Sequence, residues 1–162
     1  MTKNFLEINN VTFAASAQSK VNNVSLTIEN QGDIVCLLGP SGIGKTTILR
    51  TIAGLEKVQS GKIILKNKIL SSDNIHIEPE NRNISMGFQD NSLFPHYTVL
   101  ENIKFGADRN KKKKKGLNLN EINKLLHIEH IVNKYPHQIS SGEAQRASLA
   151  RSLLSNPDLL LL

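Results

Sequence analysis

The segment with the clearest chemistry is a phosphate-binding pattern in Gly39-Pro40-Ser41-Gly42-Ile43-Gly44-Lys45-Thr46. It reads as glycine, four variable residues, glycine, lysine, and serine or threonine. Glycines let backbone amides turn toward phosphate oxygens without a Cβ in the way. The lysine would reach the β- and γ-phosphates, and the Thr46 hydroxyl would hold Mg²⁺. The sequence therefore predicts that Gly39–Thr47 bind a nucleoside triphosphate.

The elements on either side of this loop are those that a phosphate loop requires. Gly32-Asp33 turns the chain into Ile34–Leu38, five apolar residues that predict a central strand covered on both faces. A helix predicted over Lys45–Ala53, closed by Gly54, adds its positive end and its unpaired amides. Cys36 lies inside the predicted strand, and we interpret it as a packing residue.

Hydrophobic periodicity predicts the remaining elements. The expected strands cover residues 6–8, 24–28, 63–65, 84–88 and 159–162. The expected helices cover residues 98–105, 120–128 and 143–155. The first of these helices opens with a capping box, in which Thr98 and Glu101 cap each other's backbone amides.

Composition limits the classes of function. A content of 39% hydrophobic residues over 162 residues suits one domain and excludes a disordered chain. The net charge of +6 comes almost entirely from Lys111–Lys115, and aromatic residues are only 4%, so no nucleic-acid surface is predicted. A single cysteine excludes a disulfide framework, and no apolar run reaches the ~20 residues of a membrane helix. His127 and His130 have no evident third ligand, so no metal site is predicted there.

The phosphate loop alone leaves kinases, small GTPases and recombinase-like ATPases open. A second segment, Ile139-Ser140-Ser141-Gly142-Glu143-Ala144-Gln145-Arg146, narrows the choice. It resembles the signature loop of ATP-binding cassette (ABC) proteins, which reads L-S-G-G-Q-x-Q-R. Phe88-Gln89-Asp90 falls where the Q-loop of that family lies, and Phe13 falls where an aromatic residue stacks on adenine. Residues 93–103 and Tyr135-Pro136-His137 look like importer ATPases for ferric iron, sulfate, polyamines or maltose.

This resemblance implies an α/β fold, the P-loop NTPase fold of an ABC nucleotide-binding domain. We expect a β subdomain and P-loop core in residues 1–90, with an antiparallel β part. We expect an α-helical signature subdomain in 91–145, and a return to the core in 146–162. Three residues of the family come after the strand at 159–162 and are not found in this sequence. They are an Asp that orients Mg²⁺, a catalytic Glu and a switch His. The fold is therefore expected to be incomplete at the C-terminus, and residues 1–162 alone are expected not to hydrolyse ATP.

The resemblance also implies cofactors and partners. ATP and Mg²⁺ would bind with Lys45 and Gln89 in catalytic roles and with Thr46 and Gln89 beside Mg²⁺. In a head-to-tail dimer with a second nucleotide-binding domain, Ser140, Ser141 and Gly142 would face the other subunit's ATP. Transmembrane permease subunits would dock near the Q-loop, and a periplasmic or surface binding protein would act indirectly. The expected place is the cytoplasm, on the inner face of the membrane, and the expected solute is ferric iron.

Two residues depart from the signature pattern, and several alternatives stay open. Ser141 replaces the first glycine and Glu143 replaces glutamine, so we expect a weakened but functional signature. Ser140 could simply start a helix, Phe13 could simply cap the core, and Gln89 could be a surface residue. The alternative functions are a soluble ABC ATPase acting on nucleic acid or ribosomes, and a non-catalytic remnant.

Overall fold

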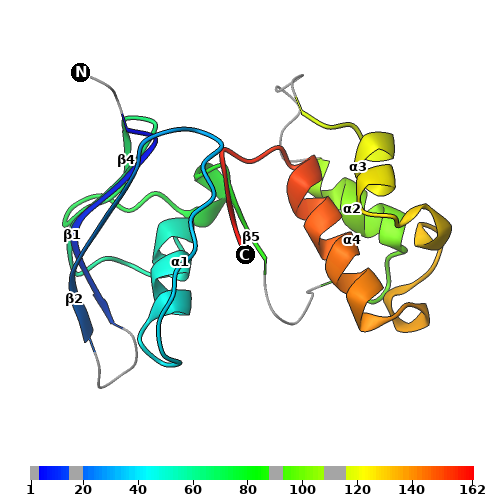
Figure 1. Ribbon diagram of the computed structural model, residues 1–162, viewed down its shortest axis with the longest axis horizontal. Helices are drawn as coiled ribbons and strands as arrows, with labels where there is room; N and C mark the ends of the chain where they lie inside the picture. Colours follow the sequence, from blue (N-terminus) through cyan, green and yellow to red (C-terminus); the bar gives the residue numbers. More distant parts are fainter. Residues whose placement is uncertain (1–3, 15–19, 88–92, 108–115) are drawn as a thin grey trace. The chain divides into compact units, whose positions relative to one another are not determined.

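An antiparallel sheet dominates the N-terminal part of the computed structural model, which describes all residues except 1–3, 15–19, 88–92 and 108–115. The chain divides into two compact units, residues 1–82 and 83–162 (Figure 1). In the first unit the strand order is β2-β1-β3-β4. The strands are β1 (Leu6–Ala14), β2 (Lys20–Ile28), β3 (Ser60–Leu65) and β4 (Lys68–Ser71).

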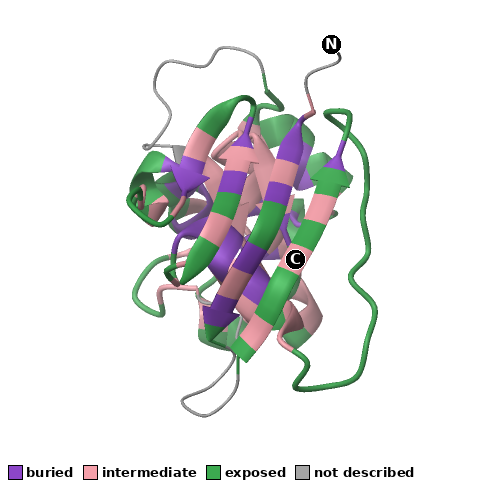
Figure 2. Ribbon diagram, turned by 90° about the vertical axis from the view of Figure 1, so that its left-hand side faces the viewer, coloured by how far each residue is buried: buried purple, intermediate pink, exposed green. Residues whose placement is uncertain are grey.

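The core of this unit lies between the sheet and helix α1 (Lys45–Ala53). Alternate residues of β1 are buried, as Figure 2 shows by the banding along the strands. Ile63 of β3 is fully buried, and Ile48 and Ile52 contribute the inner face of α1. This alternation is what a sheet with one covered face requires, and it confirms the strands predicted at 6–8, 24–28 and 63–65.

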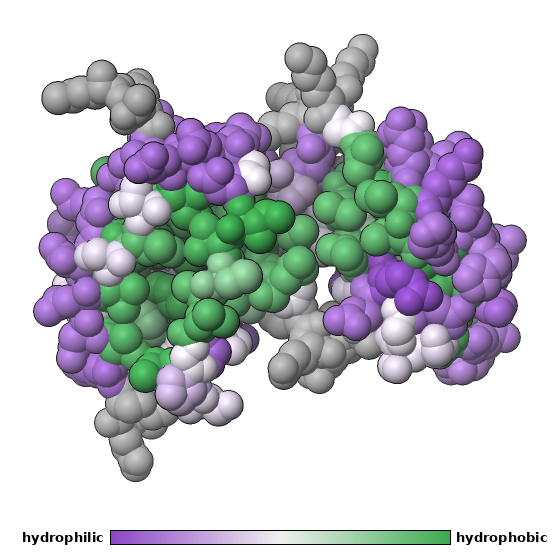
Figure 3. All heavy atoms as spheres, viewed as in Figure 1, coloured by the Kyte–Doolittle hydropathy of each residue, from purple (hydrophilic) through white to green (hydrophobic). Residues whose placement is uncertain are grey.

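Two predictions for the segment before the phosphate loop are wrong in this structure. Residues 33–40 form no strand, and Cys36 is exposed rather than packed. The side chains of Ile34 and Leu38 are 94% and 91% exposed. The physical reason is that β1 to β4 pair only with one another, so this segment gains no ladder partner in its unit. Apolar residues consequently gather on the face of the unit that Figure 3 turns to the viewer.

The second unit is mainly helical. Its helices are α2 (Val99–Ala107), α3 (Leu119–Leu125) and α4 (Ser141–Leu154), with short 3-10 turns η3 (Glu129–Ile131) and η4 (Pro136–Gln138). The fully buried core of this unit consists of Val99, Ile103, Ile122, Ile128, Ile131, Ala147 and Ala150. Strands β5 (Ile84–Met86) and β6 (Leu159–Leu161) lie within the runs predicted as strands at 84–88 and 159–162, and they pair with each other in parallel. Across the described ranges, no helix combines the length and apolarity needed to cross a membrane.

The ends of the helices follow their local sequence. Helix α1 has the predicted bounds, and Gly54 closes it with a left-handed φ of 89°. At α2, the Thr98 amide donates to Glu101 Oε2 at 2.7 Å and the Glu101 amide donates to Thr98 Oγ1 at 3.3 Å, which confirms that capping box. Helix α3 stops earlier than predicted, and His127 shortly afterward takes a left-handed φ of 52°.

Candidate functional site

The predicted phosphate loop leads directly into α1. Its glycines have positive φ angles, 155° at Gly39, 82° at Gly42 and 102° at Gly44. Gly44 is the N-cap of α1, and no side chain caps the helix there. A Cβ on Gly44 would lie 2.9 Å from Val21 Cγ2, so both the backbone angle and the space require glycine. The loop therefore presents main-chain groups and the positive end of α1, which are the groups that bind phosphate.

The Lys45 ammonium closes this loop. Its Nζ donates to the carbonyl oxygen of Gly39 at 2.6 Å and to that of Pro40 at 2.7 Å. Because the loop is exposed, an incoming phosphate can compete with these two carbonyls for the ammonium. The structure thus places the Lys45 ammonium beside the loop, and its role as a phosphate-binding cation stays a prediction.

The residues beside Lys45 differ in exposure. Ser41 and Thr46 are exposed, so the Thr46 hydroxyl is open to a metal ion bound with phosphate. Thr47 is half-buried, and its carbonyl oxygen accepts a 2.8 Å hydrogen bond from the Thr51 hydroxyl. In this donor set the Thr46 hydroxyl would be available to Mg²⁺, and Thr47 belongs to the body of the helix.

Phe13 is placed differently from what its predicted role needs. Its side chain is only 1% exposed, and its ring lies under the loop, 3.4 Å from the position of a Cβ on Gly44. Stacking on adenine needs an open face of the ring. This burial favours the alternative, a core side chain at the end of a strand, and adenine stacking stays a prediction that the burial does not support.

A buried arginine supports α1 from its C-terminal end. Arg82 is 2% exposed, and its Nη1 donates to the carbonyl oxygens of Thr51 at 3.0 Å and Ile52 at 2.9 Å. Its Nε donates to the Ile77 carbonyl at 2.6 Å and its Nη2 to Ser71 Oγ at 2.8 Å. Burial lowers the pKa of Arg82 to about 10, which leaves it a cation at neutral pH. Sequence analysis did not single out this residue, because an arginine outside any motif is typical of an exposed position.

The signature segment forms the start of α4. Ser140 is the N-cap, and its hydroxyl accepts a hydrogen bond from the Glu143 amide at 3.3 Å. The Glu143 carboxylate in turn accepts from the Ser140 amide and hydroxyl, both at 2.8 Å. Ser140 and Ser141 are exposed, and Gly142 is half-buried. The structure thus brings the three predicted signature residues together at one exposed helix end.

The Glu143 carboxylate has an unusually low proton affinity. The hydrogen bonds from the Ser140 amide and hydroxyl, and then the one from His130, hold the pKa of Glu143 at about 2. Bonds from Thr98 likewise lower the pKa of Glu101 at the start of α2. Both shifts arise because hydrogen bonds to a carboxylate favour its charged form.

This shift predicts an acid-sensitive start of α4. The pKa of Glu143 in the folded chain lies below the ordinary value of about 4.3. The stability that its ionised hydrogen bonds contribute is therefore present above that value and is lost as pH falls toward about 2. We expect the Ser140 and Glu143 amide NMR signals to move in this range, and to move much less in a Glu143→Gln variant. A Glu143 side chain that titrates near its ordinary value would contradict the prediction.

The loop before α2 carries a cluster of rings. The Phe94 ring contacts those of His96, Tyr97 and Phe105, with centroids 6.1, 5.6 and 4.8 Å away. Asn102, fully buried, holds the loop: its Oδ1 accepts from the Phe94 amide at 2.7 Å. Its Nδ2 donates to three carbonyl oxygens, those of Phe94, Tyr97 and Thr98. Sequence analysis singled out this loop but not the asparagine that fixes it.

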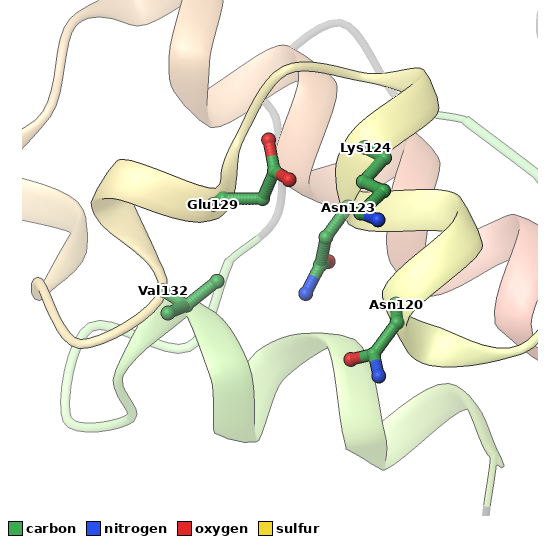
Figure 4. Close-up of a pocket in the computed structure, with 5 residues that line it drawn as sticks. All are labelled: Asn120, Asn123, Lys124, Glu129 and Val132. Atoms are coloured by element: carbon green, nitrogen blue, oxygen red, sulfur yellow. The ribbon is translucent and has the colours of Figure 1, made fainter.

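Gln89 and Lys111–Lys115 lie outside the described residues. Among the residues whose placement is described, no cluster of three or more His, Cys, Asp or Glu side chains could hold a metal. A pocket in the helical unit lies between α3 and the η3 turn (Figure 4). It is lined by Asn120, Asn123, Lys124, Glu129 and Val132, and none of these is a predicted site residue.

Comparison with known proteins identifies the family of the chain. Residues 21–162 match the family described as ABC transporter. A putrescine transport ATP-binding protein of Escherichia coli (strain K12) is 45% identical over 159 residues, which are 97% of this chain and 41% of that protein. A spermidine/putrescine import ATP-binding protein of Nitrosospira multiformis is 43% identical over 162 residues, with 97% and 42% covered. The chain therefore spans about two fifths of the length of these relatives.

Solved structures give the same assignment. The dimeric structure of a bacterial ABC transporter cassette superimposes with a TM-score of 0.76 at 27% identity, covering 96% of this chain and 72% of that one. A post-hydrolysis dimer of the same cassette, bound to ADP and phosphate, gives 0.75 at 28% identity with the same coverage. The predicted P-loop NTPase fold is confirmed, and the chain belongs to the ABC transporter family.

Proposed function

We propose that this chain is the ATP-binding part of an importer for putrescine or spermidine. The observation that carries the proposal is the phosphate loop: three glycines with positive φ, the Lys45 ammonium on the loop's own carbonyls, and an N-terminus of α1 that no side chain caps. Main-chain amides and Lys45 would hold the β- and γ-phosphates, and the Thr46 hydroxyl would bind Mg²⁺. Roles for Gln89 beside Mg²⁺ and in catalysis remain part of the proposal.

The solute is proposed from the relatives, and it corrects the expectation of ferric iron. The relatives reported above are named for putrescine and spermidine transport, and none of them is named for iron. The segments that suggested iron, Phe94-Pro95-His96 and Tyr135-Pro136-His137, lie in the part of the importer that is proposed to bind ATP, which would not contact the solute. They therefore carry no information on the solute's chemistry.

The partners follow from the same proposal. A second cassette would meet the exposed start of α4, where the Ser140 hydroxyl and the helix amides can approach the phosphates of its ATP. A dimeric cassette among the structural relatives supports this arrangement. Permease subunits would dock on the ring cluster at 94–97, which would place the chain on the cytoplasmic face of the membrane. A solute-binding protein would act through the permease.

Removing the Lys45 ammonium tests the function. We expect Lys45→Ala to weaken Mg-ATP binding about tenfold or more, because a hydrogen bond to a charged group contributes ~1.5–3 kcal/mol. Titration with a fluorescent ATP analogue measures the affinity, and Lys68→Ala, an exposed lysine on β4, is the matched control. The same change in the host's gene should lower uptake of radiolabelled putrescine and leave ferric iron uptake unchanged.

Equal ATP affinities for the wild-type chain and Lys45→Ala would refute the nucleotide site. Normal putrescine uptake by the Lys45→Ala strain would refute the solute assignment while leaving the nucleotide site intact. The two readouts therefore separate the chemistry of the loop from the identity of the cargo.

A further inference from the structure

The carboxylate of Glu143 is held from two sides. Its Oε2 accepts from the Ser140 amide and hydroxyl at 2.8 Å, and its Oε1 lies 2.9 Å from His130 Nε2. A carboxylate only accepts hydrogen bonds, so His130 Nε2 is the donor. The capping box accounts for the contacts with Ser140, but it does not require a third donor.

The position of His130 is not explained by packing. The residue belongs to η3, thirteen positions before Glu143 in the sequence, and its side chain is 62% exposed. The Glu143 side chain is 19% exposed. An exposed imidazole thus reaches across from another element to the less accessible carboxylate.

A carboxylate at this place works against the proposed function. If a second cassette brings its ATP to the start of α4, the phosphates approach a negative charge, and like charges brought together oppose association. The Ser140 hydroxyl is also directed at Glu143 Oε2 instead of at an incoming oxygen. A donor at Oε1 that draws the carboxylate toward itself and offsets part of its charge reduces the repulsion, while the Ser140 hydroxyl stays bonded to Oε2.

We propose that His130 is a positioning residue for the signature segment, which holds and offsets the Glu143 carboxylate so that the start of α4 can meet the nucleotide of a second cassette. The inference rests on the proposed function, since it concerns the same signature segment. His130 acts through Glu143 and need not touch the nucleotide itself.

A double-mutant cycle tests this role. Mg-ATP-dependent self-association of the full 162-residue chain is measured by analytical ultracentrifugation for wild type, His130→Ala, Glu143→Gln and the double variant. We expect His130→Ala to weaken association roughly threefold to tenfold, and to have no effect when Glu143→Gln is present. His130→Lys, which supplies another hydrogen-bond donor at this position, should restore association, and His130→Leu should not.

Controls separate this role from a structural one and from the proposed function. Mg-ATP affinity at the phosphate loop and the thermal midpoint of each variant are measured on the same samples, and both should match wild type for His130→Ala. Equal association of wild type and His130→Ala overturns the inference, and so does an equal loss with and without Glu143→Gln. A chain that binds Mg-ATP but does not associate also overturns it, with the nucleotide site intact. A chain that binds no Mg-ATP overturns both.

Discussion

Replacing Arg82 by methionine is expected to lower the free energy of unfolding of the N-terminal unit by about 3–5 kcal/mol, because several buried acceptors lose their donor. The guanidinium is buried at the C-terminal end of α1, where it satisfies the carbonyl oxygens of Thr51 and Ile52. Methionine fills a similar volume but leaves these carbonyls, the Ile77 carbonyl and the Ser71 hydroxyl without their donor. Each buried group left unpaired costs ~1–3 kcal/mol.

Lysine should not rescue this position. One ammonium cannot reproduce the fork with which Arg82 reaches β4, α1 and the Ile77 carbonyl at the same time. The fork also fits closely against Gly54, where a Cβ would meet the Arg82 side chain. Arg50→Met is the matched control: Arg50 forms a surface ion pair with Glu56 at 3.1 Å, and its loss should cost under about 1 kcal/mol.

Urea unfolding followed by far-ultraviolet circular dichroism gives the change in stability, and amide exchange assigns it to residues 45–53. Exchange in α1 should accelerate in Arg82→Met and stay near wild type in Arg50→Met. Because α1 carries Lys45 and Thr46, Mg-ATP affinity should fall together with stability. Equal unfolding midpoints for Arg82→Met and Arg50→Met would show that the buried hydrogen bonds are not needed.

The elements that could be predicted from the sequence are those whose signals are local. A helix start depends on residues three positions apart, as in the boxes of Thr98 with Glu101 and of Ser140 with Glu143. A helix end depends on one residue that can take a left-handed φ, as Gly54 does. The phosphate loop is local in the same sense, which is why its position and the bounds of α1 could be predicted.

Contacts between distant residues could not be predicted. Five apolar residues at 34–38 show what their side chains prefer, but not which strands lie beside them, and in the described structure none pairs with them. Phe13 occupies a position typical of a base-stacking residue, yet the loop that follows it in sequence by some thirty positions covers its ring. Arg82 finds acceptors 30 and 31 residues away, and no pattern around it indicates this.

The second large effect is expected at Asn102. Replacing it by alanine should lower the free energy of unfolding of the C-terminal unit by about 2–4 kcal/mol, because a buried amide that serves one donor and three acceptors disappears. Asn102→Asp should not rescue the loss. It retains the acceptor for the Phe94 amide, but it turns a carboxylate toward carbonyl oxygens that need a donor.

Tyrosine signals make this change measurable, because the chain has no tryptophan and Tyr97 lies in the affected loop. Near-ultraviolet circular dichroism should lose Tyr97 intensity in Asn102→Ala, as its edge contact with Phe94 loosens, and the urea midpoint should fall. Asn120→Ala, an exposed asparagine of α3, is the matched control and should change neither signal.

If the Phe94 cluster is where a permease docks, the loop must already have its bound conformation before the permease binds. Asn102→Ala should then weaken binding to the cognate permease even at temperatures where the chain stays folded. Unchanged stability and an unchanged tyrosine spectrum would show that the rings organise the loop without Asn102.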